Sequence, residues 1–314
     1  MPLAADTPEA LGLLDDAAVV PSRPGFDLVI SKDAIVEGVH FLPDDPLDAV
    51  ARKLLRVNLS DLAAKGADPY GYLLAIAWSG RHGWPARQAF ARGLEQDQRR
   101  FGLRLLGGDT VSTPGPLTAS LTILGWVAEG RTVRRSGARV GDIVLVTGAI
   151  GDGFLGLEAA RGGLGDLDDR ARAYLADRYR IPQPRLDLGL AFRDWANAAA
   201  DVSDGLIADA GRIAIASQVR LDLDLDLAPV SPAAALWLKS QADQEAARLQ
   251  LTSGGDDYEV ICTVPEAMVL KLEQAADDLG VALTRIGQVS PGQGVQTRLG
   301  GRIIQAPRTG YRHG

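Results

Sequence analysis

The sequence is poor in the residues on which disulfide and zinc chemistry depend. Among 314 residues there is one cysteine, Cys262, and there are three histidines, His40, His82 and His313. A single cysteine cannot form an internal disulfide, and no cysteine–histidine spacing typical of zinc sites occurs. Cys262 stands in the apolar run YEVICTV, which predicts a buried core position.

Long apolar runs and an excess of basic residues are missing as well. No stretch of about 18 uninterrupted apolar residues could span a bilayer. The N-terminus has no basic segment followed by an apolar one, so no secretory signal is expected. The net charge of −7 argues against a general binder of nucleic acid or membrane surfaces, because such proteins present a basic face. We therefore expect a cytoplasmic protein with neither nucleic acid nor membrane as a partner.

Two common motifs of nucleotide chemistry are also absent. No glycine precedes a lysine that is followed by serine or threonine, which excludes the usual phosphate-binding loop. The catalytic signature of protein kinases does not occur either. Any nucleotide chemistry in this chain must therefore use a different scaffold.

What the sequence does contain is an alternation of strand and helix patterns over its whole length, which predicts an α/β (α+β) protein. The basic, glycine-punctuated segment at 130–141 predicts a domain boundary. We place it between an N-terminal domain at 1–137 and a C-terminal α/β domain at 138–314. Hydrophobic spacing predicts strands at 27–31, 70–78, 103–106, 117–127, 143–147, 219–227 and 282–289, and helices at 46–66, 84–101, 151–161, 168–179, 185–196, 233–249 and 265–279.

Acidic residues recur where an apolar strand gives way to a turn or a helix. Each one alone has a structural explanation, since Asp and Ser are common helix caps and turn residues. Together they predict a cluster that needs cations, because carboxylates close together repel one another, and magnesium suits such oxygen ligands. The residues are Asp15 and Asp16 in LLDDAAVV, Ser31, Lys32 and Asp33 at the end of a predicted strand, Asn58, Ser60 and Asp61 in VNLSDLAAKG, Asp109 closing a strand in LRLLGGDT, Asp201 and Asp204 in ADVSDG, and Asp256 and Asp257 in SGGDD.

Three glycine-rich stretches predict close backbone approach to a phosphate. They are GGD at 107–109, GAIGDG at 148–153 and SGG at 253–255. Arg134 and Arg135 in VRRSGARVGD are the best-placed cations for an anionic ligand, and a solvated basic turn is the alternative.

The ordered motifs DDAAVV, SKDAIVEGVHF, NLSDLAAKGADP, LLGGDT, RRSGARVGD, VTGAIGD, DVSDGL, SGGDDYE and a terminal GY resemble the thiamine-monophosphate kinase family, within the superfamily of aminoimidazole ribonucleotide synthetase. The resemblance extends from about residue 11 to residue 312. It implies a two-domain fold whose N-terminal domain contributes to a barrel shared by a homodimer. It also implies phosphorylation of thiamine monophosphate to thiamine diphosphate, with ATP as co-substrate and several Mg²⁺ ions. The transfer is expected to be direct, with the metals as template and no catalytic side chain or covalent enzyme intermediate.

The resemblance assigns roles residue by residue, and three positions depart from the family pattern. Leu14 stands where a glycine usually precedes the acid pair, Lys32 stands where threonine is common, and Asp256 replaces a glutamate. The positions that match magnesium ligands are Asp16, Ser31, Asp33, Asp61, Asp109, Asp201 and Asp204; those that match ATP contacts are Gly108, Asp109, Arg135 and Ser203; and those that match contacts to thiamine monophosphate are His40, Asp256 and Tyr311.

Two other functions are compatible with these motifs. One is another ATP-dependent enzyme of the same superfamily, such as aminoimidazole ribonucleotide synthetase or selenophosphate synthetase. The sequence motifs VEGVHF and NLSDLAAKGA favour the thiamine enzyme. The other is a nucleotide-binding homologue that has lost catalysis, which Lys32 and Leu14 would favour.

Overall fold

The computed structural model of this chain describes residues 2–306, 310 and 311. These residues form two compact units, and each unit has its own sheet. Unit 1 comprises Met1–Leu62 and Ala67–Thr132, and unit 2 comprises Ala63–Gly66 and Val133–Gly314. The architecture is mixed α/β, as the sequence predicted.

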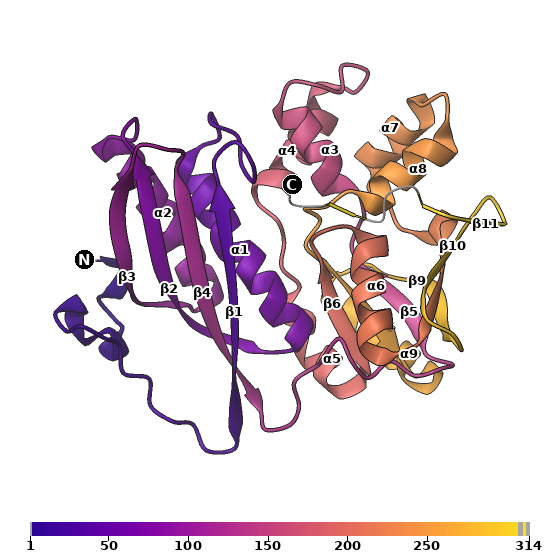
Figure 1. Ribbon diagram of the computed structural model, residues 1–314, viewed down its shortest axis with the longest axis horizontal. Coiled ribbons are helices and arrows are strands. Elements are labelled where there is room, and N and C mark those ends of the chain that lie inside the picture. Colours follow the sequence, from indigo (N-terminus) through magenta and orange to yellow (C-terminus); the bar gives the residue numbers. More distant parts are fainter. Residues whose placement is uncertain (1, 307–309, 312–314) are drawn as a thin grey trace. The chain divides into compact units, whose positions relative to one another are not determined.

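Unit 1 is a four-stranded sheet with two long helices on one face (Figure 1). The strand order is β1-β4-β2-β3, in which β2 and β3 are parallel and the other pairs are antiparallel. Two short 3-10 helices, η1 and η2, precede the sheet. The bounds are η1 Pro2–Ala4, η2 Pro8–Leu13, β1 Phe26–Val36, α1 Leu47–Lys65, β2 Asp68–Ser79, α2 Trp84–Phe101, β3 Arg104–Thr113 and β4 Thr118–Ala128.

Two strands of unit 1 run further than the sequence pattern predicted. Strand β1 continues to Val36 because β4 pairs with it along its whole length, with Ser31 opposite Ile123 and Asp33 opposite Leu121. Strand β3 continues to Thr113 because β2 pairs with it in parallel. The prediction that the SKD and GGD motifs end their strands is therefore wrong, since both motifs lie inside strands.

Helices α1 and α2 enclose a buried ion pair. Arg56 on α1 and Asp97 on α2 are both 0% exposed. The Arg56 Nε and Nη2 atoms lie 2.5 and 2.9 Å from the two carboxylate oxygens of Asp97. Arg52 adds a longer contact of 3.4 Å to the same carboxylate. The pair joins the two long helices of unit 1.

Unit 2 is built on a seven-stranded sheet of order β11-β10-β7-β9-β5-β8-β6. Only β7 and β10 are parallel neighbours among these strands. The bounds are β5 Ile143–Thr147, α3 Asp152–Ala160, α4 Asp169–Arg180, η3 Leu186–Leu188, α5 Gly189–Trp195, β6 Ala198–Val202, α6 Leu206–Ser217, β7 Arg220–Asp224, η4 Leu225–Leu227, α7 Pro232–Ser240, α8 Gln244–Ser253, β8 Glu259–Val264, α9 Glu266–Asp278, β9 Leu283–Ser290, β10 Gly294–Leu299 and β11 Arg302–Ile304.

Both faces of the central strands in unit 2 are covered, which explains their continuous apolar sequences. Val144 and Ala200 belong to a core cluster with residues of α6. Leu145 and Ala199, their neighbours in sequence, belong to a second cluster with α5 and α9. Cys262 lies in the second cluster and is 0% exposed, which confirms the predicted core position. A third cluster joins α3, α4, α7 and α8, the helices grouped together in Figure 1.

Local capping decides two of the boundaries that the hydrophobic pattern missed. The predicted strand at 219–227 ends at Asp224, whose side chain accepts the backbone N–H of Asp226 and starts a 3-10 turn. The predicted helix at 233–249 is two helices, because Asp243 caps a new helix start by accepting the N–H of Ala246. None of the described helices combines the length and the apolar composition that crossing a membrane requires.

Replacement of Asp97 by asparagine is expected to lower the free energy of unfolding by about 3 kcal/mol, because the buried Arg56 then loses the carboxylate that neutralises it. Denaturant unfolding of the full chain measures this change. Glu95→Gln on the same helix is the matched control, since Glu95 pairs with the exposed Arg99 and surface pairs contribute little. Equal effects of the two substitutions would contradict the prediction.

Candidate functional site

One group of predicted site residues lies where β1 passes α1 in unit 1. The Ser31 hydroxyl donates a hydrogen bond to Asp61 Oδ2 over 2.5 Å. The backbone N–H of Asp33 donates to Asn58 Oδ1 at 3.1 Å, and the Asn58 amide donates to Leu54 O at 2.9 Å. Asn58 and Asp61 are three residues apart, so one helix face presents both of them to β1. The NLSD motif therefore fixes the SKD strand segment.

Lys32 lies on the opposite face of β1 from this group. Successive side chains of a strand point to opposite faces. Lys32 is exposed, whereas Ser31 and Asp33 are partly buried. Threonine is common at this position in the family that the sequence resembles. Lys32 therefore does not place its ammonium group between Ser31 and Asp61.

The GGD motif in β3 depends on a close approach to β2. A Cβ atom at Gly108 would lie 1.8 Å from the carbonyl oxygen of Leu74, so only glycine fits. The next residue, Asp109, is exposed, and its Oδ1 accepts the N–H of Thr110 at 2.8 Å. The Asp109 carboxylate is thus available to a ligand. Within the described residues, no hydrogen bond links it to the Ser31–Asp61 pair.

The other two predicted positions of unit 1 differ in how firmly they are held. His40 Nδ1 accepts the N–H of Val36 at 3.1 Å, which places the proton of the neutral ring on Nε2. The buried Lys53 donates to the carbonyl oxygen of His40 at 2.9 Å. Asp16, by contrast, is exposed in the loop before β1, and its own N–H donates to Asp15 Oδ1 at 2.7 Å.

A second group of predicted residues is built around the DVSDG turn between β6 and α6 in unit 2. Asp201 is the fourth residue of β6 and is 4% exposed. Ser203 and Asp204 follow and are partly buried. Gly205 has φ 120°, and a Cβ there would lie 2.8 Å from the carbonyl oxygen of Ser253. The glycine therefore allows the turn to pass directly against the SGG segment.

Asp209, which the sequence analysis did not single out, holds this turn. Its Oδ2 accepts the backbone N–H groups of Ser203 and Asp204, each at 3.0 Å. Asp209 is 0% exposed, and burial raises the pKa of its carboxyl group to about 6. Arg212, three residues further along α6, forms ion pairs with both Asp209 and Asp204. An acidic and a basic residue three positions apart after DVSDG, Asp209 and Arg212, were the sequence signal that could have indicated this ion pair.

Two distant segments of unit 2 meet at the same turn. The N–H of Asp256 donates to Ser203 O at 2.9 Å, and the N–H of Tyr311 donates to Asp204 O at 2.8 Å. The Asp256 carboxylate accepts the hydroxyl of Tyr258 at 3.0 Å. Predicted metal, nucleotide and substrate positions of unit 2 are therefore brought together by backbone hydrogen bonds.

The GAIGDG loop does not serve as a phosphate cradle, which corrects the sequence expectation. The N–H groups of Gly151 and Gly153 donate to the Asp257 carboxylate at 2.8 and 2.9 Å. Those of Gly148 and Ile150 donate to backbone carbonyls of unit 2. Asp257 is 1% exposed, and burial raises its pKa well above the ordinary value. Four backbone donors of this loop, including those of its three glycines, are thus used inside the unit.

A buried hydrogen-bond network around Glu259 lies next to this loop and serves the packing of unit 2. Glu259 is 0% exposed and accepts bonds from Arg185 at 2.5 and 2.6 Å, from Arg178 at 3.0 Å and from Thr147 at 2.7 Å. Buried charges with this many partners stabilise a defined packing. The network fixes Glu259 at the start of β8, two residues after the SGGDD segment ends.

Arg135 lies in an exposed segment that is anchored to the end of α6. Its carbonyl oxygen accepts the hydroxyl of Ser217 at 3.0 Å, and the same hydroxyl accepts the N–H groups of Gly137 and Ala138 at 3.1 Å. The side chains of Arg134 and Arg135 are exposed. A fixed backbone with an exposed guanidinium group suits the binding of an anion.

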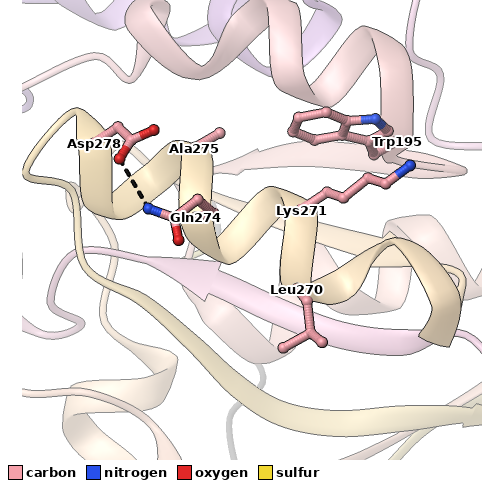
Figure 2. Close-up of a pocket in the computed structure, with 6 residues that line it drawn as sticks. All are labelled: Trp195, Leu270, Lys271, Gln274, Ala275 and Asp278. Atoms are coloured by element: carbon pink, nitrogen blue, oxygen red, sulfur yellow. Dashed lines mark hydrogen bonds between the residues drawn. The ribbon is translucent and has the colours of Figure 1, made fainter.

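An open surface pocket of about 380 Å³ is lined by residues of α5 and α9 and is separate from these groups (Figure 2). None of the predicted site residues lines it. Gln274 donates to Asp278 Oδ1 at 2.9 Å across its wall. The lining residues are Trp195, Leu270, Lys271, Gln274, Ala275 and Asp278.

The predicted ligands fit magnesium by their chemistry, because all of them offer oxygen atoms. Within residues 2–306, 310 and 311, no three His, Cys, Asp or Glu side chains gather closely enough to hold a metal alone. Magnesium commonly binds through one or two carboxylates, while water and substrate phosphates complete its shell. The Ser31–Asp61 pair in unit 1 and the acids of the DVSDG turn in unit 2 suit such partial sites.

Two family models match most of the chain. The N-terminal domain of AIR synthase related proteins matches residues 14–127, and the C-terminal domain of the same proteins matches residues 139–300.

Individual proteins match over nearly the full length. The chain is 51% identical over 313 residues to a protein named thiamine-monophosphate kinase from Caulobacter vibrioides, covering 100% of this chain and 88% of that protein. A crystal structure of thiamine-monophosphate kinase from Stenotrophomonas maltophilia has a TM-score of 0.82 and 37% identity, covering 91% and 89% of the two chains. A solved structure described as complexed with AMPPCP and TMP has a TM-score of 0.81 and 27% identity, covering 95% and 91%.

Gly205→Ala is expected to destabilise the chain by about 1–3 kcal/mol, because the new methyl group meets the backbone of Ser253 at a φ that disfavours side chains. Gly211→Ala on α6 is the matched control. Its Cβ would meet only Val295 at 3.8 Å, and alanine is the better helix former. Thermal unfolding compares the variants, and a Gly205 variant as stable as the Gly211 variant would refute the argument.

Proposed function

This chain belongs to the thiamine-monophosphate kinase family of AIR synthase related proteins, and we propose that it transfers the γ-phosphoryl group of ATP to thiamine monophosphate. The products are thiamine diphosphate and ADP. The observation that carries this proposal is the similarity over the full chain to a named thiamine-monophosphate kinase. The similar fold of a solved relative described with AMPPCP and TMP supports it.

Magnesium is the proposed template for the transfer. Asp16, Ser31, Asp33, Asp61 and Asp109 would supply ligands from unit 1, and Asp201 and Asp204 would supply ligands from unit 2. The hydrogen-bonded Ser31–Asp61 pair and the anchored DVSDG turn support these assignments, because both hold oxygen donors in fixed positions. Asp16 and Asp109 are both exposed, which leaves their carboxylates accessible to a cation.

The remaining predicted residues would bind the two organic substrates. Gly108, Asp109, Arg135 and Ser203 are the proposed ATP contacts. His40, Asp256 and Tyr311 are the proposed contacts to thiamine monophosphate. Backbone bonds that hold Ser203 next to Asp256 and Asp204 next to Tyr311 support a nucleotide and a substrate position that adjoin each other in unit 2.

Such a site performs phosphoryl transfer by positioning and charge neutralisation. The transition state needs the attacking and leaving oxygens in line and needs its equatorial charge compensated, and it does not need a protein nucleophile. Divalent metals between carboxylates and phosphates do both. The side chains of this chain then act by holding metals and substrates, and no covalent enzyme intermediate forms.

An ADP-release assay with ATP, Mg²⁺ and thiamine monophosphate tests the function. ADP and thiamine diphosphate should appear together, and thiamine or an aminoimidazole ribonucleotide precursor should not replace thiamine monophosphate. Turnover with the precursor alone would assign the chain to a different reaction. Nucleotide binding without any turnover would identify a homologue that has lost catalysis.

Asp61→Asn is expected to raise the half-saturating Mg²⁺ concentration at least tenfold, because a metal carboxylate is replaced by a neutral amide. Titration of activity with Mg²⁺ measures this change. Asp48→Asn is the matched control, since Asp48 is exposed in the first turn of the same helix. If both variants need the same Mg²⁺ concentration as the unmodified chain, Asp61 is not a ligand.

A homodimer through the sheet of unit 1 is the second part of the proposal. No described helix of this unit covers the face of the sheet opposite α1 and α2 (Figure 1). Leu28 and Ile30 of β1 are 39% and 59% exposed on this face, and Leu73 of β2 is 41% exposed. The strand register places Leu73 and Lys32 opposite the same residue of β4, so they share the face. Exposed apolar surface of this kind favours a protein partner.

Ile30→Asp is expected to convert a dimer into a monomer, because a charge would be buried without a partner at the contact. Analytical ultracentrifugation of the full chain measures the mass. Ile215→Asp is the matched control, since Ile215 is 76% exposed on α6 of unit 2. A monomeric unmodified chain, or a dimer that survives Ile30→Asp, would overturn the proposed contact.

A further inference from the structure

Three charged side chains form a closed ring on the DVSDG turn. Asp209 Oδ2 accepts the N–H groups of Ser203 and Asp204, and Asp209 Oδ1 accepts a bond from Arg212 Nη1. The other terminal nitrogen of Arg212 donates to Asp204 Oδ2. The ring therefore holds the backbone of Asp204 through one residue and its carboxylate through the other.

The two sides of the ring differ in their access to solvent. The Asp209 side chain is 0% exposed and is bonded to the backbone of the turn. The side chains of Arg212 and Asp204 are 40% and 21% exposed. The bond between Arg212 and Asp204 is therefore the part of the ring that can open without disturbing the core.

We infer that Arg212 is a built-in counter-ion of Asp204, which it releases when a divalent cation binds. This inference rests on the proposed function, in which Asp204 is a magnesium ligand. The guanidinium group and the cation compete for the Asp204 carboxylate, so the ion pair lowers the affinity of the turn for the metal. Arg212 keeps its bond to Asp209 after the exchange, and the turn keeps its backbone bonds.

Binding of Mn²⁺ to the full chain without nucleotide tests the inference apart from turnover. Free Mn²⁺, quantified by electron paramagnetic resonance, gives the dissociation constant. Arg212→Ala should tighten binding about two- to fivefold, the size expected for loss of a partly exposed ion pair. Arg212→Lys, which keeps the positive charge, should stay closer to the unmodified chain.

Arg302→Ala is the matched control, because Arg302 forms an exposed pair with Glu245 in the same unit and should leave Mn²⁺ binding unchanged. Asp204→Asn separates the inference from the proposed function. If Asp204→Asn leaves Mn²⁺ binding unchanged, Asp204 is not a ligand and the metal assignment itself fails. If Asp204→Asn weakens binding while Arg212→Ala leaves it unchanged or weakens it, the metal assignment stands and the role of Arg212 as a competing counter-ion is overturned.

Discussion

Hydrogen bonds from backbone N–H groups to buried carboxylates are the interaction on which the arrangement of these segments depends. Partners from the chain itself also orient the acidic side chains of the motifs. Three kinds of partner orient these carboxylates. The hydroxyl of Ser31 donates to Asp61, Arg212 neutralises Asp204, and backbone N–H groups surround Asp209 and Asp257. Each partner keeps an acid oriented: Asp61 and Asp204 are proposed metal ligands, whereas Asp209 and Asp257 are buried parts of the fold.

Close backbone contact is the second requirement, and it explains most of the motif glycines. A Cβ at Gly108 or Gly205 would strike the backbone of a neighbouring segment. A Cβ at Gly255 would lie 2.6 Å from the carbonyl oxygen of Ser203. These glycines let segments far apart in sequence bond through their main chains, so the acids between them are placed by backbone geometry and not by flexible side chains.

The sequence predicted elements well where hydrophobic periodicity was strong. Helix α2 spans Trp84–Phe101, as predicted, and β5 spans Ile143–Thr147, as predicted. The errors in β1 and β3 arose because polar residues such as Ser31 and Asp33 do not look like strand residues until a neighbouring strand pairs with them. The hydrophobic pattern likewise continued across the helix break that Asp243 creates, because one capping bond outweighs a few apolar contacts locally.

By itself the sequence determined the ordered motifs and, through them, the family, and it predicted oxygen ligands for a cation. These properties are local, because each depends on residue types at short spacing. Only the tertiary structure decided which groups act together. It placed Lys32 on the other side of β1 from Ser31, bound the GAIGDG donors to Asp257, and made Asp209 and Arg212 part of the DVSDG turn. Hydrogen bonds between distant segments, strand register and burial set these outcomes, and none of them follows from the order of residues alone.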